Sequence, residues 1–133
     1  MGQLNGSEIL AKALKREGVE ELFFLMGGPM LTAEAATIQE GIRCIDVRHE
    51  QAAAMMAQAY SRLRQKPGFC MAASGPATIN LSTGLANALI DCCPVVALGG
   101  ASPMLGNGKQ VFQEIDQMEI MSGCVKYAAR IYD

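Results

Sequence analysis

Two hydrophobic patterns alternate along this chain, and together they predict strands separated by helices. Short runs of consecutive apolar residues, of which ELFFLM at residues 21–26 is the clearest, are typical of strands buried on both faces of a sheet. Longer segments with an apolar residue at every third or fourth position are typical of amphipathic helices. The first such helix opens with a capping-box pattern, Asn5 followed by Glu8, and is expected to end at Gly18.

The whole pattern predicts an α/β protein. The expected strands are residues 21–26, 42–47, 69–73, 94–99 and 124–131, and the expected further helices are residues 31–40, 51–60 and 77–91. Strands that alternate with helices of this length favour a parallel sheet with helices on both faces, in three layers. No repeat, low-complexity segment or linker divides the 133 residues, so we expect one domain over residues 1–133.

Unusual residues occupy three of the expected strand-to-helix junctions. They are the GGP turn at residues 27–29, the pair His49 and Glu50, and the SGPATIN stretch at residues 74–80. Ligands of open parallel sheets bind beyond the carboxyl ends of the strands, so the three junctions should converge on one edge. Each also has a structural explanation, because glycine and proline shape turns, an acid suits a helix start and asparagine can bond the backbone. The residues alone leave both interpretations open.

Composition narrows the classes of function. Lysine and arginine (11) nearly balance aspartate and glutamate (13), and the net charge of −2 argues against nucleic acid or a membrane surface as partner. No run approaches the roughly 18 apolar residues of a membrane-spanning helix, and MGQLNGSEIL lacks a signal-peptide pattern. Five cysteines without metal-like spacing are expected to be small core residues of a cytoplasmic protein. The single histidine argues against a zinc site, so no metal ligands are assigned.

Three well-known site motifs do not fit. MGGPML, after the first expected strand, lacks the GxGxxG pattern of a dinucleotide site. PMLGNGKQ departs from a P-loop at Pro103 and Gln110. Ser74 stands in AASGP, where a hydrolase nucleophile elbow needs GxSxG.

Five stretches, in a specific order and spacing, carry a resemblance to a known family. They are GSEILAKALKREGVEELFFLMGGP, RHEQAAAMMAQAYSR, KPGFCMAASGPATINLSTGLANA, PVVALGG and FQEIDQ. With them the chain resembles, over essentially all its residues, the N-terminal pyrimidine-binding domain of certain thiamine-diphosphate enzymes. These are the acetolactate synthases, oxalyl-CoA decarboxylases and 2-hydroxyacyl-CoA lyases.

The resemblance implies a role for Glu50. In this family the matching glutamate hydrogen-bonds the pyrimidine ring of thiamine diphosphate and favours its imino tautomer, which takes the thiazolium C2 proton; the cofactor then carries the chemistry. The other positions implied to face the cofactor are Gly28, Pro29, Pro76, Asn80 and Gln113, and those implied to face the substrate are Phe112 and Gln113. His49 is expected to lie behind these residues.

The implied activity is making or breaking a carbon–carbon bond next to a carbonyl, in a small 2-oxo acid or an acyl-CoA. Met30, Gly28 and Ala77 depart from residues usual in acetolactate synthases, and GGAS and EIDQM are closer to the acyl-CoA lyases and decarboxylases. The alternative interpretation is a non-catalytic α/β module that keeps the fold and works by association.

The resemblance also implies partners. Mg²⁺ and the cofactor's diphosphate would be held by a domain absent from this chain, contributed by another subunit of a homodimer or homotetramer. The domain is expected to be incomplete at its C-terminus. The alanine-rich helix at residues 51–60 is either a core helix or an interface helix.

Overall fold

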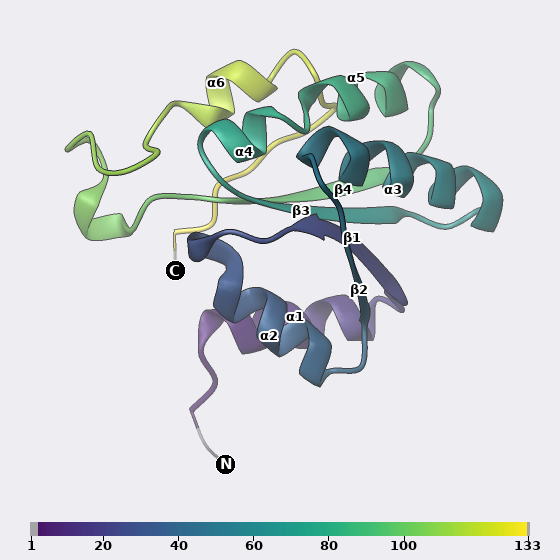
Figure 1. The fold of residues 1–133 in the computed structure, drawn as a ribbon, viewed down its shortest axis with the longest axis horizontal. Coiled ribbons are helices and arrows are strands. Elements are labelled where there is room, and N and C mark those ends of the chain that lie inside the picture. The colour runs from purple at the N-terminus through teal and green to yellow at the C-terminus, as the bar shows by residue number, and fades with distance from the viewer. Residues whose placement is uncertain (1–2, 133) are drawn as a thin grey trace.

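In the computed structural model, which describes residues 3–132, a parallel sheet lies between two layers of helices (Figure 1). Within those residues the sheet has four strands in the order β2-β1-β3-β4, and each neighbouring pair is parallel. The strands are β1 (Glu21–Leu25), β2 (Arg43–Asp46), β3 (Gly68–Ser74) and β4 (Val95–Gly100). The predicted α/β class is confirmed, and helices cover both faces.

The helices divide between the two faces of the sheet. α1 (Gly6–Arg16) and α2 (Leu31–Gln39) lie together below the sheet in Figure 1. Above it lie α3 (Glu50–Arg64), α4 (Pro76–Ile79), α5 (Ser82–Ile90) and α6 (Gln117–Met121). Short 3-10 turns, η1 (Gly28–Met30) and η2 (Met104–Gly106), follow β1 and β4. In the described part of the chain, none of the helices combines the length and apolarity needed to cross a membrane.

Side chains of the central strand β1 alternate between two apolar cores. Leu22 and Phe24 belong to the core that α1 and α2 share with the sheet, and Phe23 belongs to the core under α3. All three are buried, which confirms the prediction of a strand covered on both faces. The predicted capping box of the first helix is also present, because the Asn5 and Glu8 side chains each accept a hydrogen bond from the other's backbone N–H.

Small side chains set the position of α3. Ala53, Ala54 and Ala57 are fully buried in the core between α3 and the sheet. Gly84 of α5 packs against them so closely that an added Cβ would lie 2.5 Å from the Cβ of Ala54. One stripe of α3 is therefore core, as one of the two interpretations expected, while Met55 on another stripe is exposed.

The chain changes its winding direction between β1 and β3. β1 leads through α2 on one face to β2, and β2 returns through α3 on the other face to β3, on the opposite side of β1. Ligands of open α/β sheets bind at such switch points, beyond the carboxyl ends of the strands. The segments that leave β1 and β3 are in close contact there, because a Cβ on Gly27 would lie 2.3 Å from the Cβ of Ala73.

The helix predicted over residues 77–91 is in fact two helices. α4 ends at Ile79 and α5 begins at Ser82. Between them the N–H of Leu81 bonds the carbonyl oxygen of Thr78, three residues earlier, and this tighter turn interrupts the regular helix. The apolar spacing continues through the break, so the pattern did not reveal it. Asn80 lies in the break.

The prediction of a strand at residues 124–131 is wrong. Residues 124–132 have neither helix nor strand, and β4 pairs only with β3 in the part of the chain that the structure describes. A strand requires backbone hydrogen bonds to a neighbour, and the apolar character of CVKYAARI cannot supply them. The segment instead runs past α5 and β4 with Tyr127 exposed.

The expectation that the cysteines are core residues holds for Cys70. It is fully buried, and burial raises the pKa of its thiol to about 12, which makes it unreactive. Cys92 is exposed and does not belong to the core, because the chain reverses there between α5 and β4. All five thiols are free.

Candidate functional site

Glu50 is a buried carboxylate at the start of α3. It is the first residue of the helix and only 8% exposed. Its Oε2 accepts a hydrogen bond of 2.9 Å from Nδ2 of Asn80. His49 is the helix N-cap, with Nδ1 accepting from the N–H of Gln51 at 3.2 Å. The capping function therefore belongs to His49, and the Glu50 side chain bonds Asn80 instead.

The Glu50–Asn80 pair joins two of the three predicted junctions. Glu50 follows β2, and Asn80 follows β3 in the break between α4 and α5. At this break the asparagine side chain reaches Glu50 of α3. Glu50 and Asn80 thus lie at the same edge of the sheet, as their junctions implied.

The free oxygen of Glu50 fits a heteroaromatic ligand. Within residues 3–132 no hydrogen bond reaches Oε1, while Asn80 holds Oε2 as an acceptor. A proton on this carboxyl would therefore sit on Oε1, where it could be donated to a ring nitrogen; the charged form could accept from a ring N–H. A buried, oriented carboxyl of this kind fits the pyrimidine ring of thiamine diphosphate.

The turn after β3 is built around Gly75. Its φ of 60° is in the left-handed region, and an added Cβ would lie 2.2 Å from the carbonyl oxygen of Gln113. The backbone of Gln113 therefore rests directly on the turn that leads into Pro76. Gln113 itself has a φ of 59°, and its Oε1 accepts from the Ser74 hydroxyl at 3.1 Å. The structure thus brings the predicted residues Pro76 and Gln113 together.

Gln117, the first residue of α6, is a site residue that the sequence did not indicate. Its Oε1 accepts from the N–H of Gly75, and its Nε2 donates to the carbonyl oxygen of Gly100 at 2.9 Å. One side chain therefore connects the turn after β3 to the end of β4. Gln117 is the last residue of the FQEIDQ stretch, but nothing in the sequence distinguished it from the neighbouring residues as the one that makes these two hydrogen bonds.

Glu114 orders the loop that carries Phe112 and Gln113. Its carboxylate accepts hydrogen bonds from the backbone N–H groups of Gly108 and Val111. These backbone hydrogen bonds, of which that from Gly108 has the largest effect, hold the pKa of Glu114 below its ordinary value. The loop is therefore fixed by a charged side chain at its base.

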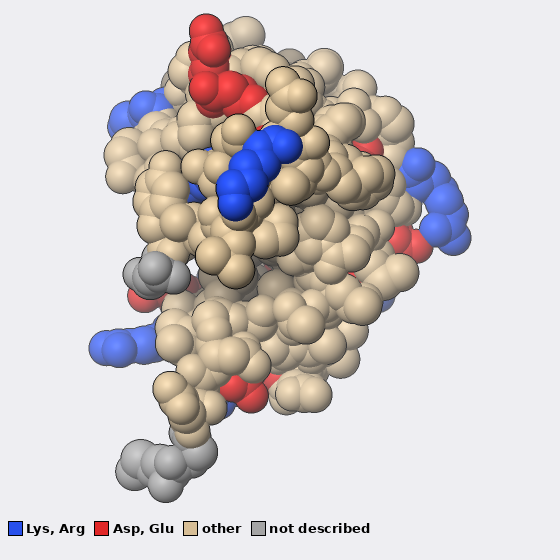
Figure 2. Space-filling model, turned by 90° about the vertical axis from the view of Figure 1, so that its left-hand side faces the viewer, with Lys and Arg blue, Asp and Glu red and all other residues tan. Residues whose placement is uncertain are grey.

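A hollow of about 520 Å³ lies beside these residues. Side chains from the ends of β1 and β3 and from the loop after β4 line it, namely Pro29, Ser74, Ala101, Ser102, Pro103, Val111 and Phe112. Figure 2 faces the end of the molecule where the strands finish, and mostly uncharged side chains cover it around a recess. Phe112 is 84% exposed at this end. Pro29 and Phe112 thus share one hollow.

Gly28 shows no structural need for glycine. It begins η1, is exposed, and an added Cβ would meet nothing within 4 Å. Pro76 is also exposed, at the first position of α4. Both residues are thus open to solvent, and neither lines the hollow.

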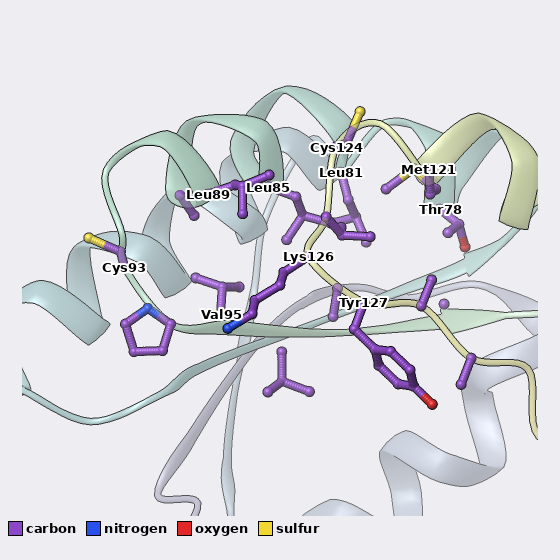
Figure 3. A pocket seen from close by; sticks show the side chains of 18 of the residues that line it. Thr78, Leu81, Leu85, Leu89, Cys93, Val95, Met121, Cys124, Lys126 and Tyr127 are labelled. Carbon is purple, nitrogen blue, oxygen red and sulfur yellow. The ribbon is translucent and has the colours of Figure 1, made fainter.

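A larger cavity, of about 750 Å³, has a different character (Figure 3). It lies between α5, β4 and residues 124–129, and most of its walls are apolar, with Leu81, Leu85 and Met121 among them. Its lining contains no carboxylate, so it offers no group that could activate a cofactor. The lining of the smaller hollow has no carboxylate either, but it includes Ser74, whose hydroxyl bonds Gln113. We take this hollow and the Glu50–Asn80 pair together as the candidate site.

The part of the chain that the structure describes contains no group of three His, Cys, Asp or Glu side chains able to hold a metal ion. The nearest carboxylate to the hollow in sequence, Glu114, is occupied by backbone N–H groups. Any metal bound with a diphosphate would therefore need ligands other than these residues.

Comparison with known proteins identifies the family of this chain. Residues 4–120 match the family model described as thiamine pyrophosphate enzyme, N-terminal TPP binding domain. The chain is 39% identical over 127 residues to acetolactate synthase isozyme 2 large subunit of Escherichia coli, covering 94% of this chain and 23% of that protein. It is 39% identical over 127 residues to 2-hydroxyacyl-CoA lyase 2 of Caenorhabditis elegans, covering 96% of this chain and 20% of that protein. It is 38% identical over 128 residues to 2-hydroxyacyl-CoA lyase 1 of Homo sapiens, covering 96% of this chain and 22% of that protein.

The chain spans about a fifth of the length of these curated relatives. The family match nevertheless runs from α1 into α6 and includes every junction that builds the site. With a carboxyl that fits a pyrimidine ring at the switch point of a parallel sheet, the chain belongs to the N-terminal TPP-binding domains of the thiamine pyrophosphate enzymes.

Proposed function

We propose that this chain binds the pyrimidine half of thiamine diphosphate and activates the cofactor through Glu50. The observation that carries the proposal is the buried Glu50 carboxyl, whose Oε2 is held by Asn80 while Oε1 is left to a ligand. When bound, thiamine diphosphate supplies the nucleophilic carbon for making or breaking a bond next to a carbonyl. Glu50 would hold or move a proton at Oε1, against the ring nitrogen.

Asn80 supports this role by fixing the orientation of the carboxyl. Its Nδ2–H keeps Oε2 an acceptor, so the proton is confined to the oxygen that faces the ligand. Glu50 is buried while Asn80 is exposed, so the hydrogen bond is partly shielded from competing water. Gly28, Pro29 and Pro76 would then form the walls against the ring.

Phe112 and Gln113 are proposed to face the substrate. Phe112 lines the hollow beside Pro29, and the Gln113 side chain is positioned by the Ser74 hydroxyl. The exposed phenyl ring would cover the bound substrate and exclude water. The relatives of this chain include acetolactate synthases and 2-hydroxyacyl-CoA lyases. We therefore propose a small 2-oxo acid or an acyl-CoA as the substrate class.

The complete active site is proposed to need a second polypeptide segment. The relatives are about four to five times as long as this chain, and its described residues hold no metal-binding cluster. We propose that a diphosphate-binding domain of another subunit supplies Mg²⁺ ligands, in a homodimer or homotetramer. The large exposed side chains Leu63 and Ile90, both at least 80% exposed, support burial against a partner. The free cysteines support a cytoplasmic location.

The test is proton exchange at C2 of bound thiamine diphosphate, followed by NMR in deuterated buffer with the intact gene product. Glu50→Gln keeps the shape of the side chain but cannot transfer a proton, and general acid–base catalysis typically contributes ~10²- to 10⁴-fold. We expect the exchange rate to fall by about that factor. Glu17→Gln, at an exposed position outside the site, is the matched control. Exchange in Glu50→Gln at the parent rate would refute the proposal.

A non-catalytic module that works by association is the second candidate. The exposed apolar side chains at Leu63 and Ile90 favour it as much as they favour an enzyme subunit. The same exchange measurement separates the two, because a module without catalysis would not accelerate C2 exchange above the rate of the free cofactor.

A further inference from the structure

The amide of Gln117 occupies a position that its place in α6 does not require. A glutamine at a helix start normally extends into solvent, yet both ends of this amide are used inside the molecule. Oε1 accepts from the N–H of Gly75 and Nε2 donates to the carbonyl oxygen of Gly100. The helix itself is capped by another residue, Asp116, which accepts from the N–H of Glu119. The side chain of Gln117 is therefore not needed to cap the helix.

The two backbone groups that Gln117 bonds lie at special points. Gly75 has a positive φ and carries the backbone of Gln113 on its Cα face. Gly100 ends β4, and its Cα lies so near Ser74 that an added Cβ would be 3.0 Å from the Ser74 nitrogen. The pairing of β3 and β4 is irregular at this point, between Ala72 and Ser74. Sheet pairing alone thus does not fix the turn.

The Gly75 turn leads directly to the catalytic pair. Pro76 begins α4, a helix of four residues, and Asn80 follows it with its side chain on Glu50. A helix this short has little stability of its own, so its position depends on contacts at its ends. Displacement of the turn would move Asn80 relative to Oε2 of Glu50.

We propose that Gln117 is a positioning residue that fixes the Gly75 turn and, through it, the Asn80–Glu50 pair and the backbone of Gln113. The inference deepens the proposed function and rests on it. Gln117 needs no contact with cofactor or substrate in this role. Its two hydrogen bonds hold the end of β4 and the turn after β3 in one geometry.

Two substitutions in the intact gene product separate the two hydrogen bonds. Gln117→Leu has a similar size and loses both bonds. Gln117→Glu keeps an acceptor for the Gly75 N–H but loses the donor to Gly100. Gln39→Leu, on the exposed side of α2 and without a hydrogen bond in the described structure, is the matched control. The first readout is hydrogen exchange of the Gly75 amide, which needs no cofactor.

We expect the protection of the Gly75 amide to fall by about two- to tenfold in Gln117→Leu, the range of one hydrogen bond, and to persist in Gln117→Glu. We expect C2 exchange of bound thiamine diphosphate to fall in Gln117→Leu by a similar factor in the folded enzyme, with Gln117→Glu in between. If the leucine variant does not fold, the glutamate variant tests the proposal. We then expect its Gly75 amide to keep the parent protection and its C2 exchange to fall by a smaller factor.

Three results would overturn the proposal. Parent-like Gly75 protection in Gln117→Leu would show that the bond does not hold the turn. Lost protection with parent-like C2 exchange would make the role structural only. A fall in C2 exchange that merely follows the unfolded fraction, measured by circular dichroism, would do the same. A parent protein without C2 exchange would refute the proposed function instead, and the Gly75 readout would still decide whether Gln117 holds the turn.

Discussion

At the scale of single residues, the site depends on backbone positions as much as on charged side chains. Gly75 combines a left-handed φ with a contact that leaves no room for a Cβ, and both conditions arise because the loop carrying Gln113 returns onto the end of β3. The contact seats the backbone of Gln113 on the turn that leads through Pro76 to Asn80, the partner of Glu50. The requirement for glycine at residue 75 is therefore a requirement of the site.

We expect Gly75→Ala to lower the free energy of unfolding by at least ~2 kcal/mol, because strain at positive φ and overpacking each cost roughly 1 to 3 kcal/mol. Gly123→Ala is the control, since no atom lies within 4 Å of its added Cβ and its φ is not positive. Thermal unfolding followed by circular dichroism measures both. Equal midpoints for the two variants would contradict the contact with Gln113.

The carboxylate of Glu114 makes the loop sensitive to acid. Because hydrogen bonds from backbone N–H groups lower its pKa in the folded state, its contribution to stability is present above the unfolded value of 4.5 and is lost as the pH falls through the lowered folded value. We expect Glu114→Gln to lower the unfolding midpoint at about pH 6.5 and to have little effect at about pH 3.5.

The control for this pH dependence is Glu17→Gln. Glu17 is exposed, and its side chain makes no hydrogen bond within the described residues. Its substitution should change the midpoint little at either pH. A Glu114→Gln effect of the same size at both pH values would show that the charge of Glu114 does not hold the loop.

At the scale of elements, close packing of α3 and α5 determines where Glu50 begins its helix. Gly84 and Ala54 meet without space for another carbon, and the Gln58 amide bridges Asn87 and Asp91 across the same pair of helices. Apolar contact and polar bridge together fix α3 against α5. The first turn of α3, with Glu50, is thereby held opposite the break that carries Asn80.

We expect Gly84→Ala to destabilise the protein by roughly 1 to 2 kcal/mol, since overpacking costs ~1 to 3 kcal/mol and the gain in helix propensity returns at most ~1 kcal/mol. Thr83→Ala, on the exposed side of the same helix, should stay within about 0.5 kcal/mol of the parent. Urea unfolding gives both values. A stabilised Gly84→Ala variant would mean that α3 and α5 can move apart freely.

At the scale of the whole molecule, the proposed cofactor site has ligand groups for one part of the cofactor only. The described residues offer a carboxyl for a ring nitrogen, an apolar hollow and two glutamines, but no cluster for a metal ion. Among the described residues, the His, Cys, Asp and Glu side chains thus offer no ligand set for a metal ion that would accompany the diphosphate. The arrangement suits a domain that shares its ligand with another.

We expect the 133-residue chain by itself to bind thiamine diphosphate and Mg²⁺ no tighter than about 1 mM, because one hydrogen bond to a charged group contributes only ~1.5 to 3 kcal/mol. Isothermal titration calorimetry measures the affinity, and the intact gene product is the positive control. Micromolar binding by the chain alone would show that this domain holds the diphosphate by itself.

The sequence by itself determined the alternation of strands and helices, the layers of the sheet and the neighbourhood of the site. The spacing of apolar residues and the residues that cap a helix are local properties of the sequence. Neighbouring residues were therefore enough to predict the strand at ELFFLM, the Asn5 capping box and the junctions at Glu50 and Asn80. The family resemblance added the expected partner of Glu50, a cofactor ring. The roles assigned to the individual site residues stay predictions.

Only the tertiary structure decided the break before α5, the failure of residues 124–131 to form a strand, and the function of Gln117. Each depends on a group far away in the chain: Glu50 for the side chain of Asn80, a strand neighbour for residues 124–131, and both Gly75 and Gly100 for Gln117. Hydrogen bonds between distant segments exist only once the chain has folded, because their geometry is set by the packing of several elements together. No local pattern records them.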